Sequence, residues 1–321
     1  MHPWLVMASA AMLLGAATPP PVTFTSYTRQ FDTFAAATEQ MPREQRVAAF
    51  RAKFDSLMPG LYTASDPARL DRRIARALEE FPSLRPSYHE VERNFPVAFA
   101  TAASRFRAVF PDFVSPLPIY LVHELGVRDG GSDYVDGRKV MLFGADVIAK
   151  IHNDDSLQPF LTHELFHLEH GRHFADCNQL WCLLWQEGLA TYAASAMTPD
   201  ATDHQLLLDQ PTAIRPAVDA HWNEALCLVA GKFEATDDDT LGAAFSSSSH
   251  PPGLPARFGY YVGLKVATEA ARIRTLPQLS RLDNSQARPV VVAALTDLIT
   301  KAHAACPPPS ATAAATPDRK S

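Results

Sequence analysis

Residues 163–167 read His163-Glu164-Leu165-Phe166-His167, which places two histidines and a glutamate within five positions. Two histidines four residues apart on a helix lie on one face, so both imidazoles can reach a single metal ion. Glu164 lies beside the first histidine, from where its carboxylate can hydrogen-bond a water held by that ion, as a general base must. Leucine and phenylalanine recur around the motif at helical spacing, which predicts a packed helix.

Glu187 is the expected third ligand, twenty residues after His167. It is the only charged residue in positions 177–199, within a segment that is mostly apolar. A lone carboxylate in such a segment is costly to bury unless a cation compensates its charge, and a divalent metal ion does so. Gly188 follows directly. Because glycine in a helix costs about 1 kcal/mol relative to alanine, we expect it to permit close approach of another backbone, that of the His163 helix.

Together, His-Glu-x-x-His and the later Glu-Gly-Leu-Ala-x-Tyr at residues 187–192 resemble the gluzincin clan of zinc metallopeptidases. The chain is more closely similar to bacterial families described only as predicted zinc-dependent proteases. This resemblance is specific over residues 157–194 and weaker over 117–146. It implies a metalloprotease, a hydrolase of peptide bonds, with one zinc ion per chain.

The resemblance also implies a role for each motif residue. His163, His167 and Glu187 would be the zinc ligands, and Glu164 would activate a zinc-bound water for attack on the peptide carbonyl. Many gluzincins carry an acidic residue one turn after the third ligand, where it orients a ligand histidine. This chain has Thr191 at that position.

A second ligand set is present in the same stretch. A metzincin-like site would use a third histidine ten positions after His163, which is His173 in this chain. Its glycine would occupy position 170, but that residue is His170 and the glycine is displaced to Gly171. The pattern therefore favours Glu187, and His170 and His173 are also explained as a polar helix end that complements the helix dipole.

The expected fold class is α+β and mostly helical. A spacer and a helical N-terminal region cover residues 18–110, and a zinc peptidase-like catalytic region covers 111–305. In the catalytic region, 117–122 and 139–143 are predicted strands, separated by a Gly- and Asp-rich loop. The gluzincin resemblance implies a small sheet before the metal-binding helix, with the second of these strands as the edge that binds an extended substrate or, alternatively, as an ordinary core strand.

Helix-like patterning in the N-terminal region is interrupted by prolines, including Pro82 and Pro86. The expected helices lie near residues 24–39, 43–57, 67–80 and 87–110. A final helix is expected near residues 288–305, and the polar segment 234–257 is expected to be a loop, either at the mouth of the cleft or as a solvated connector.

Tyr260 is the candidate for stabilising the oxyanion of the tetrahedral intermediate. It lies in a Gly-Tyr-x-x-Gly element, Gly259 to Gly263, similar to one in the predicted zinc-protease families. A phenol near the metal would suit this role, although a tyrosine packed in the core explains the residue as well. His221 and His250 are weaker candidates for the same role.

An exported protein is expected. Residues 1–17 resemble a signal peptide without a basic n-region, and their cleavage would leave no stable membrane span. Four cysteines suggest disulfides, and we expect Cys177 with Cys182 and Cys227 with Cys306. The location would be periplasmic or secreted, and the tail 306–321 is rich in Pro, Ala and Thr, which predicts disorder.

The charge balance limits the partners. With a net charge of −6 and no basic stripe, the chain is not expected to bind nucleic acid. The expected partner is a peptide or protein substrate. The alternatives are a non-catalytic binding or scaffold protein with a degraded zinc site, and zinc-dependent hydrolysis of a non-peptide amide, because the same site chemistry serves both substrates.

Overall fold

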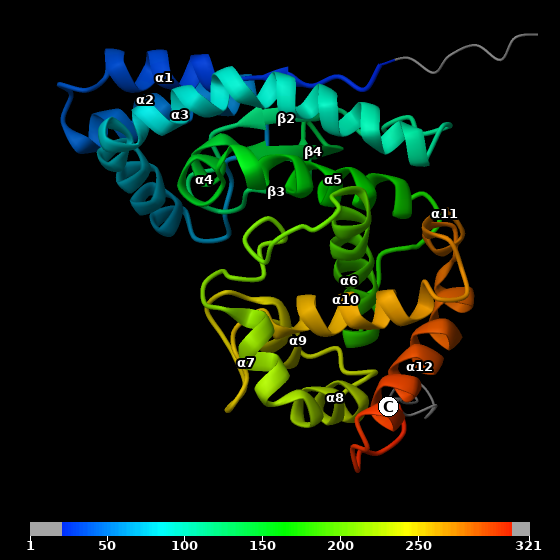
Figure 1. The fold of residues 1–321 in the computed structure, drawn as a ribbon. Coiled ribbons are helices and arrows are strands. Elements are labelled where there is room, and N and C mark those ends of the chain that lie inside the picture. The colour runs from blue at the N-terminus through cyan, green and yellow to red at the C-terminus, as the bar shows by residue number, and fades with distance from the viewer. Residues whose placement is uncertain (1–20, 310–321) are drawn as a thin grey trace, which may run out of the picture.

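The computed structural model describes residues 21–309 as an α+β protein that is mostly helical, with one four-stranded sheet (Figure 1). The strands are β1 (Thr25–Ser26), β2 (Ile119–Val122), β3 (Gly130–Val135) and β4 (Arg138–Gly144). The helices are α1 (Thr28–Ala37), α2 (Arg43–Leu57), α3 (Pro67–Val109), α4 (Ala145–Ile151), α5 (Asp154–His170), α6 (Leu180–Met197), α7 (Ile214–Ala220), α8 (Trp222–Gly231), α9 (Asp238–Phe245), α10 (Phe258–Ala270), α11 (Leu276–Ser280) and α12 (Asn284–Lys301). The coarse class predicted from the sequence is therefore confirmed.

Helix α3 crosses the top of the molecule as one continuous element of 43 residues (Figure 1). The expected break at Pro82 and Pro86 was wrong. A proline inside a helix leaves the carbonyl four residues earlier without its usual donor, and for Pro82 that carbonyl belongs to Leu78. Arg46 of α2 donates to the Leu78 carbonyl oxygen at 3.5 Å, and the buried face of α3 continues past both prolines.

The sheet has the order β1-β2-β4-β3, so β3 is an edge strand and β4 is interior. The expected loop at residues 130–135 is therefore wrong, as is the substrate-binding edge at β4, while the alternative of β4 as an ordinary core strand is confirmed. Val135 pairs with Arg138 across a two-residue turn in which Asp136 and Gly137 have φ of 51° and 69°. An Asp-Gly pair with two positive φ angles is typical of a type I′ hairpin turn, which adds β3 to the outside of β4.

Helices α6 and α10 cross at a pair of glycines, Gly188 and Gly263. A Cβ atom on Gly188 would overlap the Gly263 backbone, and one on Gly263 would lie 2.5 Å from the Leu184 carbonyl oxygen. The close approach expected for Gly188 is therefore present, but its partner is α10 and not the His163 helix. Small residues at both positions bring the two helix backbones together.

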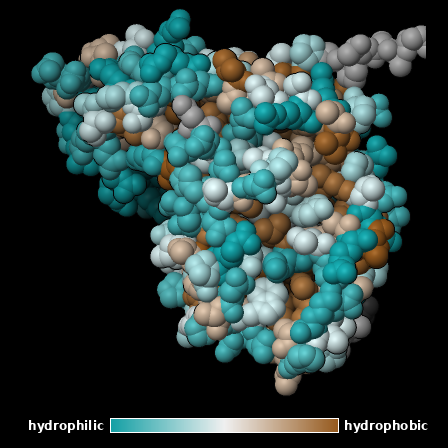
Figure 2. Space-filling view, in the orientation of Figure 1, coloured by the Kyte–Doolittle hydropathy of each residue, from teal (hydrophilic) through white to brown (hydrophobic). Residues whose placement is uncertain are grey.

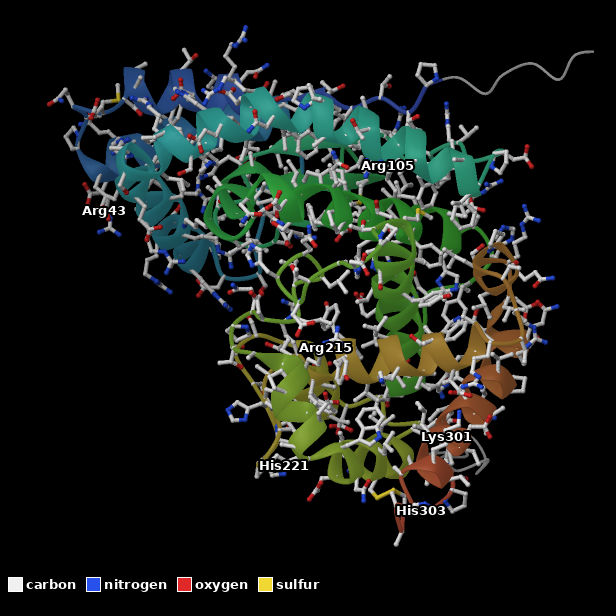
Figure 3. All side chains as sticks on the ribbon, in the orientation of Figure 1. Arg43, Arg105, Arg215, His221, Lys301 and His303 are labelled. Atoms are coloured by element: carbon white, nitrogen blue, oxygen red, sulfur yellow. A yellow bond between two sulfur atoms is a disulfide. The ribbon has the colours of Figure 1, made fainter. Side chains whose placement is uncertain are left out.

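Both expected disulfides are present, Cys177 with Cys182 and Cys227 with Cys306. The second joins α8 to the end of the described chain, where a sulfur pair is visible near His303 (Figure 3). The proposed signal peptide, and the tail beyond residue 309, lie outside the described residues. Within residues 21–309, none of the helices combines the length and apolarity that crossing a membrane requires.

The segment expected to be a loop at residues 234–257 contains α9, so that expectation was wrong for residues 238–245. Asp237 caps this helix by accepting from the Thr240 backbone N–H at 2.8 Å, and Asp238 and Asp239 lie in the first turn, where negative charge is favourable. The face drawn in Figure 2 is mostly hydrophilic over the N-terminal helices, with hydrophobic side chains in small groups.

Candidate metal centre

Helix α5 carries His163 and His167 on the face opposite its buried leucines. It begins with a capping box in which Asn153 accepts from the Ser156 N–H at 3.0 Å and Ser156 accepts from the Asn153 N–H at 3.0 Å. The opposite side of the helix packs into the core through Leu161 and Leu165, while Phe160 and Leu168 are buried at the margin of the cleft. The two imidazoles are left on the side that lines a cleft.

Helix α6 brings Glu187 to the same point. The first two N–H groups of α6 are satisfied by backbone carbonyls of Ala235 and Phe233, at 2.9 and 3.1 Å, which fixes where the helix starts. Glu187 follows two turns later, and about a fifth of its side chain is exposed in the cleft. Thus two helices with different tertiary partners meet at one group of ligand atoms.

Three ligand atoms are close enough to share one cation. Nε2 of His163 lies 3.0 Å from Nε2 of His167 and 3.2 Å from Oε2 of Glu187, and the third separation, between His167 and Glu187, is 3.5 Å. Zinc bonds of about 2.0–2.1 Å in a tetrahedral arrangement place neighbouring ligand atoms about 3.3 Å apart. Two imidazoles and one carboxylate at these separations therefore fit a three-ligand zinc site.

The pKa shifts of the three clustered groups also indicate that one positive charge is favourable between them. Burial would raise the pKa of Glu187, but the imidazoles of His167 and His163 outweigh it and hold that pKa well below its usual range. Burial would lower the pKa of His167, yet the Glu187 carboxylate raises it. For His163 burial prevails and lowers the pKa. A proton on His167 or a metal cation between the three groups supplies this charge.

Glu164 lies in the same cleft and is 9% exposed. Burial raises its pKa to about 8, with a smaller opposing effect of His167. A carboxyl group with a pKa near neutrality can both accept and return a proton, which is what a general base and acid must do. Gly130 makes room for it, because a Cβ atom on Gly130 would lie 2.6 Å from the Glu164 Cδ atom.

Tyr260, at the start of α10, is placed beside the cluster. Its ring centroid lies 6.4 Å from that of His163, and its side chain lines the cleft. Burial raises the pKa of the phenol further above its usual value, so Tyr260 stays a neutral hydrogen-bond donor. The two weaker candidates do not line the cleft: His221 lies near α7 and α8 at the lower end of the molecule, away from α5 (Figure 3), and His250 is exposed.

The alternative metzincin-like ligand set is not assembled. Among the described residues, the cluster that could hold a metal ion consists of His163, His167 and Glu187. His173 instead faces Glu169, at 4.0 Å. His170 is buried beside Phe174, and burial lowers its pKa to about 3, so it is a neutral core histidine and does not complement the helix dipole as a cation.

The cleft, of about 540 Å³, also contains residues that the sequence analysis missed. Asp129 lies just before β3 and accepts a hydrogen bond from His152 at 3.0 Å. Burial would raise the Asp129 pKa, but the hydrogen bond and charge of His152, together with a backbone hydrogen bond and the charge of Arg257, lower it. Gly130 and Arg257 line the cleft as well. The Asp-Gly hairpin signal at residues 136–137 could have placed β3, and with it Asp129 and Gly130, but nothing local indicated Arg257.

Comparisons with protein-family models, with curated protein sequences and with solved structures found no match to this chain. The gluzincin resemblance therefore remains an expectation that rests on the motif residues.

Proposed function

We propose that this protein is an exported zinc-dependent peptidase of gluzincin type. The observation that carries the proposal is the convergence of His163, His167 and Glu187 from two helices, with ligand-atom separations of 3.0–3.5 Å, next to the buried carboxyl group of Glu164. The two disulfides support a periplasmic or secreted location.

His163, His167 and Glu187 would hold the zinc ion. When bound, zinc supplies a Lewis acid that lowers the pKa of water and polarises a carbonyl. Glu164 takes a proton from the attacking water on its carboxylate and passes it to the leaving nitrogen. Tyr260 donates its phenolic hydrogen toward the oxygen on which negative charge develops.

The substrate is proposed to bind as an extended peptide along β3. This strand is hydrogen-bonded to β4 on one side, and residues 130–132 line the cleft. An edge strand offers free main-chain groups to an added strand. Arg128 already donates to the Ser132 carbonyl oxygen, at 2.9 Å, so the substrate pairs along the Gly130 and Gly131 end.

Zinc content and peptide hydrolysis, measured together on three purified proteins, test the proposal. Wild type is expected to hold about one zinc per chain and to cleave members of a broad peptide library. Glu164→Gln is expected to keep the zinc and to lose hydrolysis, because the amide cannot take a proton. Glu187→Ala is expected to lose most of the zinc, since one of three ligands is gone.

Mass spectrometry of the native protein gives the zinc content, and chromatography of the peptide products gives the hydrolysis. Unchanged turnover in Glu164→Gln would contradict the role of Glu164. Zinc binding without cleavage of any peptide would favour the scaffold alternative. Thr191 is consistent with that alternative, because its hydroxyl donates to the Glu187 carbonyl oxygen within α6, at 2.8 Å, instead of orienting a ligand.

A further inference from the structure

Three basic side chains line the cleft, and they differ in their partners. Lys139 lies 3.2 Å from a carboxylate oxygen of Asp176, and Arg172 lies 2.8 Å from one of Glu169. Arg257 has no carboxylate oxygen within 4.0 Å among the residues that the structure describes. Of these three side chains, Arg257 is the one whose guanidinium makes no direct ion pair with a described residue, so it can form one with a ligand.

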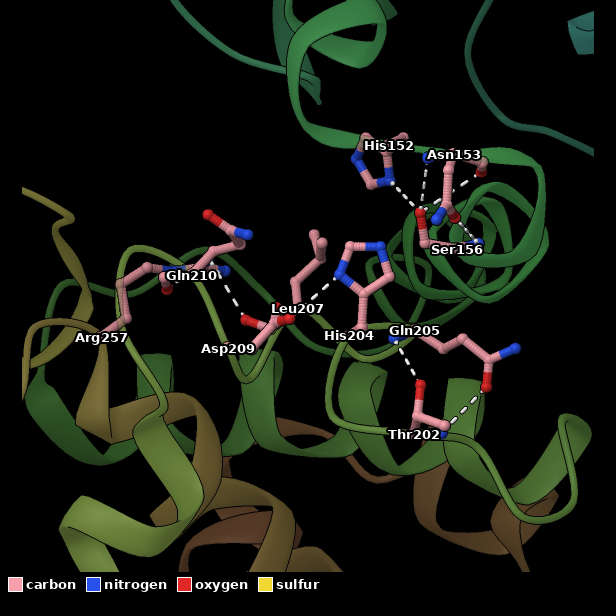
Figure 4. A network of polar contacts seen from close by, with 10 residues as sticks. All are labelled: His152, Asn153, Ser156, Thr202, His204, Gln205, Leu207, Asp209, Gln210 and Arg257. Atoms are coloured by element: carbon pink, nitrogen blue, oxygen red, sulfur yellow. Dashed lines mark hydrogen bonds and ion pairs between the residues drawn. The ribbon is translucent and has the colours of Figure 1, made fainter.

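Arg257 acts on the Asp129 carboxylate of the same cleft only through a longer-range interaction that helps to lower the Asp129 pKa, and its direct contacts are to an aromatic ring and to backbone carbonyls. Its Cζ atom lies 4.4 Å from the centroid of the Tyr260 ring, in a cation–π contact. One terminal nitrogen donates to the carbonyl oxygens of Leu207 and Gln210, at 3.5 and 3.4 Å, and Figure 4 shows the side chain beside Gln210. A guanidinium has five N–H donors in a planar fork, so donors remain for a carboxylate.

The backbone of Arg257 is unusual for a residue with a long side chain. Its φ is 61°, in the left-handed region, where glycine is the unstrained residue. Strained residues are concentrated at functional sites because the surrounding structure enforces them. Here the residue with the left-handed backbone carries a charged side chain that lines the cleft.

Arg257 lies close enough to the candidate metal site to bind a substrate group near the cleaved bond. The centroid of the Tyr260 ring lies 6.4 Å from that of His163 and 4.4 Å from the guanidinium carbon of Arg257. The guanidinium carbon is therefore at most about 11 Å from the centroid of the His163 ring. An extended peptide advances about 3.3 Å per residue. A carboxylate bound by Arg257 would then lie within about three residues of the bond at the metal site.

We propose that Arg257 is a specificity-determining residue that binds a carboxylate of the peptide substrate, within about three residues of the cleaved bond. This inference rests on the proposed peptidase function. The carboxylate is either the C-terminal carboxylate of the substrate or the side chain of an internal Asp or Glu. In the first case the protein is an exopeptidase that releases short C-terminal fragments. Both kinds of carboxylate present the same planar, charged acceptor to the guanidinium.

The test uses binding to the full-length Glu164→Gln protein, so that the readout does not depend on turnover. Three libraries of short peptides are compared by mass-spectrometric detection of the retained peptides: free-acid peptides, C-terminal amides without Asp or Glu, and C-terminal amides that contain them. The Glu164→Gln protein is expected to retain one carboxylate class about 10- to 100-fold better than the neutral amides, as expected for a charge-assisted contact.

Adding Arg257→Gln is expected to remove this preference while the neutral amides bind as before, and Arg257→Lys to restore part of it. Arg172→Gln is the matched control, an arginine of the same cleft whose carboxylate partner is Glu169, and is expected to keep the preference. An equal loss for all libraries in Arg257→Gln would show a structural role and overturn the proposal. So would the absence of a carboxylate preference, or of any retained peptide, in the Glu164→Gln protein.

The same libraries, incubated with the wild type, separate this inference from the proposed function. Retention that depends on Arg257, without cleavage by the wild type, would support the carboxylate site and contradict the peptidase. Cleavage of the libraries without a preference for a carboxylate would support the peptidase and contradict the role of Arg257.

Discussion

His123 is a buried residue outside the cleft with a definite effect on acid stability. Its ring stacks on Phe31 at 3.5 Å, and its Nδ1 atom has no hydrogen-bond partner. Burial lowers its pKa to about 4, although Asp146, 3.7 Å away, opposes this. The unfolded chain, with a pKa near 6.5, binds the proton more readily. Protonation therefore favours the unfolded chain, and the free energy of unfolding falls as the pH falls from 6.5 through 4.

We expect this loss to be about 3 kcal/mol, and to be absent in His123→Gln, which stays neutral. Urea unfolding gives the unfolding free energy of both proteins between pH 4 and 7.5. The difference between wild type and variant should change with pH by the expected amount. Glu124, whose pKa burial raises to about 7, has the opposite pH dependence but is present in both proteins. A constant difference across this range would contradict the prediction.

At the residue scale, the sequence was sufficient to predict those site residues whose relative positions are set within one helix. His163 and His167 are four residues apart on one helix, so their spacing alone predicted a shared face, with Glu164 beside the first of them. The isolated charge of Glu187 identified the fourth residue. The position of Arg257 depends on how α10 meets the segment 205–210, which no local pattern encodes. Its role could therefore be inferred only from the structure.

At the element scale, the crossing of α6 and α10 positions Glu187, the residue directly before Gly188. Gly188→Ala is expected to destabilise the protein by about 1–3 kcal/mol, because the methyl group overlaps the Gly263 backbone and the helices must separate. Separation also displaces Glu187, so zinc affinity should fall with stability. Thermal unfolding and zinc titration measure the two effects.

Gly242→Ala in α9 is the matched control, since an added Cβ there meets no atom within 4 Å. There the helix propensity of alanine should dominate and stabilise by up to about 1 kcal/mol, without a change in zinc affinity. Equal effects of the two substitutions would contradict the role assigned to the crossing.

Helices whose own apolar residues recur at helical spacing were predicted well. Elements that depend on contacts with another helix or strand were not. The bounds of α2 agree with the expected helix at residues 43–57. Strand β3 was missed because its two glycines and its aspartate have low strand propensity, which pairing with β4 overrides. Helix α3 was divided at Pro82 because the compensating donor, Arg46, lies on another helix.

At the scale of the whole molecule, the N-terminal region and α5, which carries two of the candidate metal ligands, share one core. Strand β1 pairs with β2, and Phe95 of α3 contacts Phe143 of β4, which in turn contacts Phe160 of α5, with ring centroids 5.2 and 5.8 Å apart. A protein that starts at residue 111 would expose this apolar surface and lose a strand. We expect it to show no cooperative thermal unfolding and no zinc binding.

The control is a protein that starts at residue 21, which keeps every described element and should unfold cooperatively. Calorimetry of both proteins, with the zinc content measured on the same samples, makes the comparison. Cooperative unfolding and a zinc site in the shorter protein would show that residues 111–309 fold independently.

The glycine pair at the α6–α10 crossing also constrains how this chain can evolve. Neither Gly188 nor Gly263 belongs to the candidate metal cluster of His163, His167 and Glu187, yet a side chain at either would overlap the opposing helix and shift Glu187. Selection for metal binding would therefore act on both positions together. In any homologous lineage that kept the site, a larger residue at one position should appear only with a compensating change in the opposing helix, and both positions should become variable where the site has been lost.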